Sequence, residues 1–310
     1  MQGAQARSGG PTNQGIGMKF FLRFVRKLLI ASLSACAAFA ALPAGAADWS
    51  DTYIGYRYGT KFAEPFNNED ITKNIVNLSH ASGYKYGTNF FNVDLLMSNS
   101  KDPANCSGGT CSGSAQEAYV VYRNTVDASK FGKEFKYGIM RSWGATGGFD
   151  WNAKTDAGYN SKKRMLVLGP TIMFDVPGFL NLSLLALWES NAPCSTFPGS
   201  AGCVNRYYYK THPALSAAWG IPIGAGFSFE GYALYIGKKG KDEFGAETKP
   251  ETNFDGQIMY DVGALMGSKN TFKVGLEYQY WKNKFGNDSS GPAGDGAFAK
   301  TPMIRAEYHF

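Results

Sequence analysis

Apolar and polar residues alternate with a period of two along most of the chain after residue 46. Successive side chains of a β-strand point to opposite faces, so this period predicts strands, whereas helical periodicity is weak. We expect twelve strands, at residues 51–62, 71–82, 86–98, 116–126, 133–144, 162–174, 179–190, 204–219, 226–237, 252–264, 270–283 and 299–310.

The C-terminal stretch MIRAEYHF shows the alternation to the last residue. Every second position from Ile304 to Phe310 is apolar, and Arg305, Glu307 and His309 lie between them. A strand at a chain end needs a pairing partner, and in a closed barrel the last strand pairs with the first. We therefore expect Phe310 to face lipid at the periplasmic rim, and the three ionisable residues to face a watery lumen.

The connections between the expected strands alternate in length. Those after even-numbered strands are short, such as 175–178 and 267–269, and those after odd-numbered strands are mostly longer and rich in Gly, Ser, Asn and Asp. After residue 46 no apolar run approaches the ~20 residues of a spanning helix. The pattern predicts an all-β fold, a 12-stranded antiparallel transmembrane β-barrel with short periplasmic turns and longer extracellular loops in a bacterial outer membrane.

A large secreted β-sandwich would also alternate apolar and polar residues. Two observations favour the barrel. The chain has 18 Tyr and 22 Phe, many of them near strand ends, where an interfacial girdle needs them. Charges of both signs lie in the middle of strands, where a pore wall would carry them. Pro170 cannot donate a hydrogen bond within its expected strand, so we expect a bulge there.

The N-terminal region predicts the compartment. Residues 18–46 contain a basic start, an apolar run and a small-x-small site, which together form a secretory signal peptide. Residues 1–17 are interpreted as an over-extended start or a leader, and residues 47–310 as a single transmembrane β-barrel domain. Cleavage as a lipoprotein at Cys36 is an alternative, but the apolar run continues past that residue.

Removal of the signal changes the charge balance. Residues 1–46 hold five of the 31 basic residues and none of the 25 acidic ones, which leaves 31 − 5 = 26 basic against 25 acidic. The formal charge of +6 therefore belongs mostly to the targeting segment. The basic pI is no argument for a nucleic-acid partner, and none is expected.

Four cysteines remain after the signal, in two close pairs, each within a long Gly/Ser-rich gap. An even number in an oxidising compartment predicts local disulfides, Cys106 with Cys111 and Cys194 with Cys203. The spacing is not that of a zinc site and no histidine lies near either pair, so we expect no metal. No cofactor is expected.

Several stretches resemble the Tsx-like family of nucleoside-specific outer-membrane channels, which includes the outer-membrane protein K type of phage receptors. They are YRYGTKFAEPF (56–66), GYKYGTNFFNVDLL (83–96), RMLVLGPTIMFDVPGFLNLSLLALWESN (164–191), VGLEYQYWKNKFGN (274–287) and the final RAEYHF. The resemblance covers nearly all of the mature chain. It specifies the fold more strongly than the substrate, because these motifs are strand-length patterns.

The resemblance implies a narrow, monomeric channel that binds nucleosides weakly during passive diffusion. It also implies bacteriophage as a possible partner of the extracellular loops. The final Tyr308-His309-Phe310 resembles the terminal signature by which bacterial outer-membrane barrels are recognised by the assembly machinery, and the predicted barrel implies outer-membrane lipid as the surroundings. The cysteine loops, 98–115 and 191–203, are departures from better-studied members and leave gating and surface recognition open.

The candidate substrate-binding residues come from facing alone. A nucleoside offers a flat base to aromatic rings and hydroxyls to charged or amide groups. Charged side chains on the lipid face would cost about 2–4 kcal/mol at the midplane, so they are assigned to the lumen. The expected lumen residues are Arg57, Lys61, Asn92, Asp94, Tyr119, Arg123, Glu189, Glu230, Asp255, Gln257, Asp261, Glu277, Gln279, Trp281, Arg305 and Glu307.

Alternatives remain for these residues. Trp281 could stack a base or lie at the membrane interface, and each lumen charge could contact solute or belong to a salt-bridge ladder that braces the barrel. Mixed signs favour a neutral solute over a phosphate pore, which would need a basic ring.

Other functions are compatible with parts of the same sequence. A non-selective or other small-solute porin fits the same pattern, and the loops could act as a phage receptor or adhesin. His80 and Ser82 have the spacing of a lipid-hydrolysing His–Ser pair, but they lie near an expected periplasmic turn and no orienting residue is evident. We therefore expect no enzyme.

Overall fold

The computed structural model describes residues 47–132, 136–196 and 202–310, so the expected leader, the signal peptide and Cys36 lie outside the described residues. The barrel strands are β1 (Ala47–Glu64), β2 (Asn67–Tyr84), β3 (Gly87–Ser98), β6 (Gln116–Asp127), β7 (Met140–Lys154), β8 (Arg164–Phe174), β9 (Phe179–Asn191), β11 (His212–Gly224), β12 (Phe227–Ile236), β13 (Glu251–Asp261), β14 (Phe272–Lys282) and β15 (Phe298–His309). Shorter elements are β4 (Asn105–Ser107), β5 (Thr110–Ser112), β10 (Tyr207–Tyr208), η1 (Ala128–Phe131), η2 (Gly263–Met266), η3 (Lys284–Gly286) and η4 (Asp295–Ala297).

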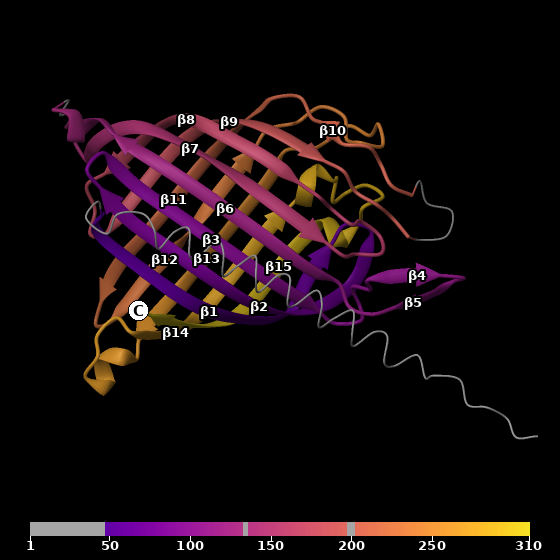
Figure 1. Cartoon of the computed structure of the whole chain (residues 1–310), viewed down its shortest axis with the longest axis horizontal. Helices are drawn as coiled ribbons and strands as arrows, with labels where there is room; N and C mark the ends of the chain where they lie inside the picture. The colour runs from indigo at the N-terminus through magenta and orange to yellow at the C-terminus, as the bar shows by residue number, and fades with distance from the viewer. Residues whose placement is uncertain (1–46, 133–135, 197–201) are drawn as a thin grey trace, which may run out of the picture. The chain divides into compact units, whose positions relative to one another are not determined.

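The twelve long strands form a closed antiparallel barrel (Figure 1). Each strand pairs with its neighbours along the chain, and β15 pairs with β1 from Tyr53 opposite His309 to Gly59 opposite Met303. The last strand therefore has its partner, as the MIRAEYHF pattern requires. The prediction of a twelve-stranded antiparallel barrel is confirmed.

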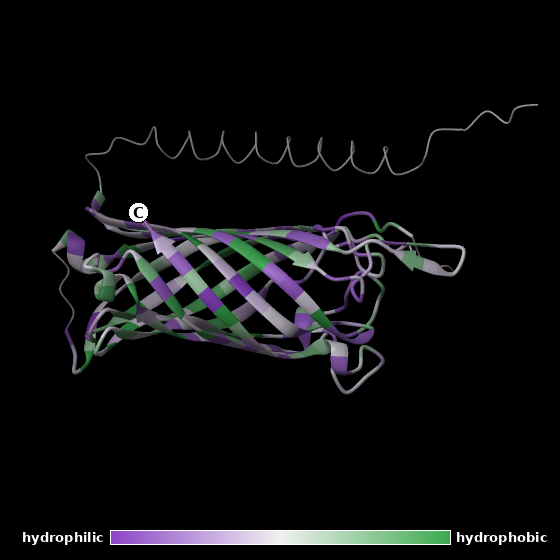
Figure 2. Cartoon of the chain, turned by 90° about the horizontal axis from the view of Figure 1, so that it is seen from below, coloured by the Kyte–Doolittle hydropathy of each residue, from purple (hydrophilic) through white to green (hydrophobic). Residues whose placement is uncertain are grey.

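The two faces of the wall differ in character. On β14 and β15 the outward Leu276, Ile304 and Tyr308 are exposed, whereas the inward Arg305 and Glu307 are buried. Figure 2 shows the resulting bands of hydrophobic and hydrophilic residues across the tilted strands. The apolar outer wall matches the hydrocarbon of a membrane. Because the sheet is closed, no unpaired strand edge is exposed to that hydrocarbon, as an outer-membrane barrel requires.

None of the helices in the described segments combines the length and the apolar character needed to cross a membrane.

The connections differ in length at the two ends of the barrel. The C-terminal end of β15 lies at the end with short turns such as 85–86 and 225–226, opposite the β4–β5 hairpin (Figure 1). Three connections depart from the expected rule. The first extracellular connection is only Pro65-Phe66, because β1 and β2 each run for 18 residues, and the periplasmic connections 128–139 and 262–271 are long.

Two predicted strands were misplaced. The fifth strand is Met140–Lys154 where 133–144 was expected, and the eighth is His212–Gly224 where 204–219 was expected. Glycines in β7 obscure the alternation. They are needed there, because a Cβ at Gly144 or Gly148 would lie 1.8 or 2.0 Å from a carbonyl oxygen of β6.

The bulge expected at Pro170 is absent, and that prediction was wrong. Pro170 lies opposite Ala145 in an unbroken β7–β8 ladder. The β8–β9 ladder has no pair at Pro170, because proline lacks the N–H, and it resumes in the same register at Thr171. The proline therefore interrupts the pairing of the two strands without the extra residue that defines a bulge. Register shifts occur instead between Met140 and Ser142 and between Pro222 and Gly224.

Part of the barrel interior is apolar. One buried cluster consists of Met165, Val167, Leu185, Leu187, Ala214 and Ile236, on β8, β9, β11 and β12. A second consists of Phe62, Ile71, Ile75 and Met303, on β1, β2 and β15. The interior is therefore packed with apolar side chains in two places and is not uniformly polar.

Truncation of Leu187 to Ala is expected to reduce the free energy of unfolding by about 2–5 kcal/mol, because it opens a cavity in the first cluster. Leu184, on the same strand, points outward and is 57% exposed. Leu184→Ala should cost less, because lipid or detergent fills the space. Denaturant unfolding in detergent micelles tests both, and equal losses would contradict an inward cluster.

Candidate functional site

Ion pairs between distant strands identify the side chains that project into the lumen. Lys154 on β7 contacts Glu64 on β1 at 3.3 Å, although three strands separate β7 from β1 around the wall. Such a contact is possible only through the interior. By the same contacts and by cross-strand pairing, all the expected lumen residues except Lys61 lie on the inner face.

Lys61 is the exception, and its placement in the lumen is corrected. Gly59 is buried, but two positions later Lys61 is exposed and Phe62 is buried instead. The β1–β15 ladder ends at Gly59, and Thr301 donates a hydrogen bond to the carbonyl oxygen of Lys61 at 2.7 Å. The alternation thus shifts by one residue here, which simple parity could not foresee.

A continuous chain of ion pairs crosses the middle of the lumen. Arg57 contacts Asp94 at 2.5 Å and Glu277 at 3.1 Å. Arg305 contacts the other oxygen of Glu277 at 2.7 Å and Glu307 at 2.6 Å. Glu277 and Glu307 have fully buried side chains, so this chain, which we call the arginine ladder, braces the wall.

The arginine ladder continues to the periplasmic mouth. Glu307 contacts His309 at 3.2 Å, and His309 contacts Asp51 at 2.8 Å. Arg305 also donates to the hydroxyl of Tyr53 at 2.9 Å. The inward face of MIRAEYHF therefore meets the N-terminal part of β1, and the prediction that this face looks into the lumen is confirmed.

Other expected lumen residues form smaller groups. Arg123 contacts Asp150 at 2.6 Å, and the hydroxyl of Tyr119 donates to the same carboxylate at 3.0 Å. Asn92 donates to Asp94 at 2.9 Å. Asp150 was not foreseen, because the glycines around it disguised its strand.

The β12–β14 wall carries amide–carboxylate pairs. Gln279 donates to Asp255 at 3.1 Å, and Gln257 donates to Glu230 at 3.4 Å. Lys273 lies 3.9 Å from Glu230. These contacts place amide and charged groups of both signs on one side of the lumen.

Asp261 has a local structural role. Its carboxylate accepts the backbone N–H groups of Ala264 at 3.1 Å and Asn270 at 2.9 Å. It therefore closes the periplasmic turn that contains η2 and is not free to hold a solute.

A group of buried charges, the lysine hub, lies near the extracellular end. Glu64 is its centre, with Lys73 at 2.6 Å, Lys284 at 3.1 Å and Lys154 at 3.3 Å. Lys154 also contacts Asp102 at 3.2 Å and Asp156 at 2.6 Å. None of these lysines was predicted. Lys154 ends its strand and Lys284 lies in a loop, whereas Lys73 lies within β2 and was not assigned to the lumen from the sequence.

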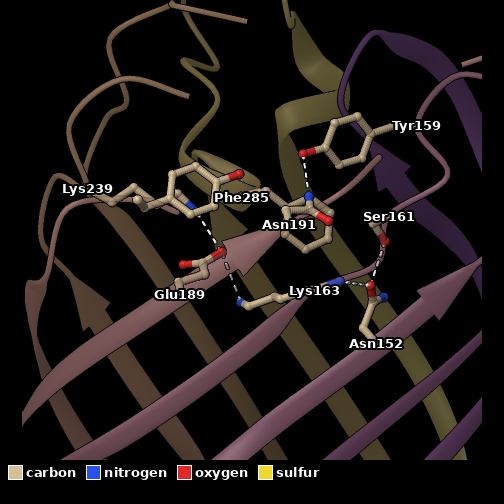
Figure 3. Close-up of a pocket in the computed structure, with 9 residues that line it drawn as sticks. Asn152, Tyr159, Ser161, Lys163, Glu189, Asn191, Lys239 and Phe285 are labelled. Atoms are coloured by element: carbon tan, nitrogen blue, oxygen red, sulfur yellow. Dashed lines mark hydrogen bonds and ion pairs between the residues drawn. The ribbon is translucent and has the colours of Figure 1, made fainter. Parts of the chain in front are cut away.

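A second group surrounds Glu189 (Figure 3). Lys239 lies 3.0 Å, Lys163 3.6 Å and His212 3.6 Å from its carboxylate. The cavity beside them has a volume of about 10 Å³, which holds about one water molecule. Glu189 is thus an anchor for the extracellular loops, and nothing of nucleoside size fits beside it.

Trp281 points inward near the extracellular end. Its indole N–H donates to Glu251 at 3.3 Å. The ammonium of Lys284 lies 5.0 Å from the centre of its ring, and Phe285 packs edge-on at 4.8 Å. The ring is therefore already occupied by neighbours, which favours a bracing role over base stacking.

Two aromatic rings that were not predicted remain accessible within the lumen. Phe90 pairs with Arg123, and Tyr232 pairs with Asp255, so both share the inner face. Their exposed fractions are 40% and 38%, far above those of the arginine ladder. Phe90 and Tyr232 each lie two residues from an expected lumen residue, Asn92 and Glu230, so the alternation predicts that they face inward. Only the packing in the structure shows that their rings stay uncovered.

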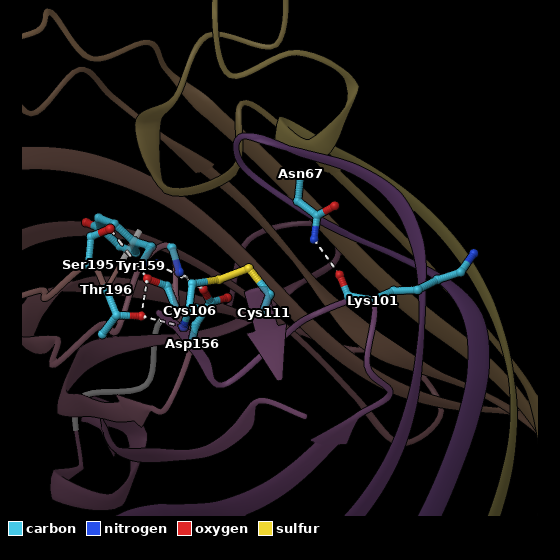
Figure 4. Close-up of a disulfide and its surroundings, with 10 residues drawn as sticks. Asn67, Lys101, Cys106, Cys111, Asp156, Tyr159, Ser195 and Thr196 are labelled. Carbon is cyan, nitrogen blue, oxygen red and sulfur yellow. Dashed lines mark hydrogen bonds between the residues drawn. A yellow bond between two sulfur atoms is a disulfide. The ribbon is translucent and has the colours of Figure 1, made fainter. Parts of the chain in front are cut away.

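Both predicted disulfides are present, Cys106–Cys111 and Cys194–Cys203. The first pins the β4–β5 hairpin, whose Cys106 N–H donates to the hydroxyl of Thr196 in the second cysteine loop at 3.1 Å (Figure 4). Thr196 in turn donates through its backbone to Ala157 at 2.7 Å. Three extracellular loops are therefore joined to one another.

The His80–Ser82 pair lies on the outer face of β2, beside the short 85–86 turn at the periplasmic end, as expected from the topology. Nδ1 of His80 is 2.8 Å from the hydroxyl of Thr52. No hydrogen bond joins His80 to Ser82 in the described part of the chain. Nothing in this geometry supports hydrolysis.

No protein-family model and no curated protein matches the chain. Solved barrels that are similar in structure include the following three. The KdgM porin is 8% identical over 83% of this chain and 99% of its own (TM-score 0.40). The translocator domain of the autotransporter NalP from Neisseria meningitidis is 12% identical over 92% and 96% (0.44), and the outer membrane protein OpdK from Pseudomonas aeruginosa is 11% identical over 86% and 100% (0.23). Likeness at this level says nothing of what the barrel carries.

The chain is an outer-membrane barrel. This follows from its own closed sheet and apolar outer wall.

Glu277→Gln is expected to lower the free energy of unfolding by about 3–5 kcal/mol, because it leaves two buried guanidinium groups short of their shared carboxylate. Glu230→Gln is the matched control. Its side chain is 27% exposed and its cation lies at 3.9 Å, so it should cost less than about 1 kcal/mol. Denaturant titration of both variants in detergent tests this, and a near-neutral Glu277→Gln would show that the ladder does not brace the wall.

The environment of Asp102 predicts that the stability of the barrel depends on pH. Burial, together with a hydrogen bond to Asp156, raises the pKa of the Asp102 carboxyl from 3.8 to about 7, against the attraction of Lys154. The folded chain therefore holds this proton more tightly than the unfolded chain does. Its stabilising contribution is full below about pH 4 and is lost as the pH rises through 7.

Asp102→Asn should remove that dependence. The difference in unfolding free energy between variant and wild type should shift in favour of the variant as the pH rises from 4 to 8. Chemical unfolding in detergent at several pH values measures it, and a constant difference would contradict the raised pKa.

Proposed function

We propose that the barrel is a channel for passive, selective diffusion of small neutral solutes, and of nucleosides in particular. The observation that carries this proposal is the pair of accessible aromatic rings, Phe90 and Tyr232, in a lumen whose charges are otherwise paired. A nucleoside base can stack on such rings, and its sugar can exchange hydrogen bonds with the charged groups nearby.

Accessibility separates contact residues from braces. The side chains of Asp94, Arg123 and Glu230 are 19%, 20% and 27% exposed, whereas those of Glu277 and Arg305 are 0% and 7% exposed. We assign the first three to solute contact and the last two to the wall. Paired charges exert little net field, so a neutral solute is favoured over an ion.

Tyr232 is the best single candidate for base stacking. Its hydroxyl lies 3.5 Å from the amide of Asn253 and within electrostatic range of Asp255, Arg57 and Asp94. The ring therefore lies near both the accessible charges and the arginine ladder. Binding there must remain weak for the channel to conduct.

The test is ion current through refolded protein in a planar bilayer, with adenosine or thymidine titrated against glucose. Nucleosides should reduce the current at millimolar concentrations and glucose should not. Tyr232→Leu should weaken the nucleoside effect about tenfold, since stacking on an aromatic side chain is worth about 1–3 kcal/mol. Tyr235→Leu, outward on the same strand, should leave it unchanged.

Equal effects of nucleosides and glucose would indicate a general small-solute pore and contradict the selectivity. An unchanged nucleoside effect in Tyr232→Leu would remove the aromatic contact from the proposal.

A further inference from the structure

A group of polar side chains lies on the outer wall, where an apolar surface is expected. On β2, Asn77 faces inward to the ion pairs, and positions three and five residues later therefore face outward. These are His80 and Ser82. Asn89 on β3 lies directly opposite Ser82, and Asn124 on β6 lies opposite Asn89.

The level of this group is the periplasmic membrane interface. The 85–86 turn that joins β2 to β3 follows immediately, and Tyr84, Tyr86 and Tyr122 stand around the polar side chains. Tyrosines at this height belong to the interfacial girdle, at the level of the lipid headgroups. The wall at this height is covered by the phospholipids of the periplasmic leaflet.

The hydrogen bonds fix which groups remain available. Oδ1 of Asn89 accepts from the hydroxyl of Tyr122 at 2.8 Å and from Nδ2 of Asn124 at 2.9 Å. The NH₂ group of Asn89 therefore takes no part in these hydrogen bonds. Thr52 engages Nδ1 of His80 at 2.8 Å, which leaves Nε2 for another partner.

Three groups thus lack partners within the described residues: Nδ2 of Asn89, Nε2 of His80 and the hydroxyl of Ser82. Ser82 is recessed, with an exposed fraction of 8%. Polar groups at the edge of hydrocarbon are costly unless they form hydrogen bonds, so a ligand of matching chemistry is favoured there.

Lys85 supplies the charge. It lies in the turn next to these groups, its ammonium is 5.1 Å from the centre of the Tyr86 ring, and no carboxylate of the described residues forms a salt bridge with it. A cation in the adjoining turn, together with the three hydrogen-bonding groups, matches a phosphodiester.

We propose that Ser82, Asn89, His80 and Lys85 bind the phosphate group of a phospholipid in the periplasmic leaflet. The acyl chains of that lipid lie along the adjoining outer wall. The site is separate from the lumen and does not depend on which solute the channel carries.

The experiment compares two lipids with the same acyl chains, dioleoylphosphatidylglycerol and dioleoylglycerol, added to detergent-purified, delipidated protein and followed by native mass spectrometry. The phospholipid should bind and the uncharged lipid should not. Asn89→Asp should weaken phospholipid binding about tenfold, because it keeps the acceptor for Tyr122 and Asn124 but replaces the free NH₂ by a negative charge.

Asn74→Asp is the matched control. Asn74 also faces outward on β2, and its Oδ1 accepts from the hydroxyl of Tyr56 at 2.6 Å, so the change adds the same charge away from the site. It should leave phospholipid binding unchanged. Ser82→Ala, which removes one hydroxyl without adding charge, should weaken binding whether or not Asn89→Asp folds.

Equal binding of the two lipids, or wild-type affinity in Ser82→Ala and Asn89→Asp, would overturn the proposal. A parallel titration with inorganic phosphate distinguishes the source of the anion. Binding of free phosphate without any binding of phospholipid would also overturn it, because the site would then serve a soluble anion.

Discussion

The interior of this barrel depends on one constraint: a charge removed from water must meet an opposite charge. Twelve strands enclose too little space for each ionic side chain to keep its own hydration shell. The carboxylates of Glu277 and Glu64 therefore each serve more than one cation, and side chains from strands far apart in the sequence are drawn to common points. Those shared contacts hold the lumen to its shape.

In the channel that we propose, the same constraint separates the surface that contacts solute from the scaffold. Where charges are fully paired and covered, as in Arg305 with Glu277, they form part of the wall. Where pairing is looser and rings are uncovered, as near Glu230 and Tyr232, a passing molecule finds groups that can exchange partners. Selective diffusion needs both, because a rigid outline sizes the solute and a yielding contact releases it.

Most of the fold was predictable from the sequence, because barrel strands repeat the simplest rule in the chain. Period-two alternation located ten of the twelve predicted strands closely, and it failed at β7, where glycines such as Gly144 and Gly148 remove the signal. The same parity placed the inward charges correctly until the shift after Gly59 carried Lys61 to the outside. The alternation of residues does not predict packing. It does not show which inward residues are covered, or which loop lysines fold back to contact Glu64.

The lysine hub also bears on the order of assembly. Glu64 ends the first strand, whereas Lys284 lies in the loop before the last strand, 220 positions later. The carboxylate and its first two lysine partners are in place once the early strands form, but the third ammonium arrives only when the chain is nearly complete. Closure of the sheet and completion of this buried charge group are therefore one event. An incomplete barrel would be marked by both an open edge and an unbalanced charge at its outer end.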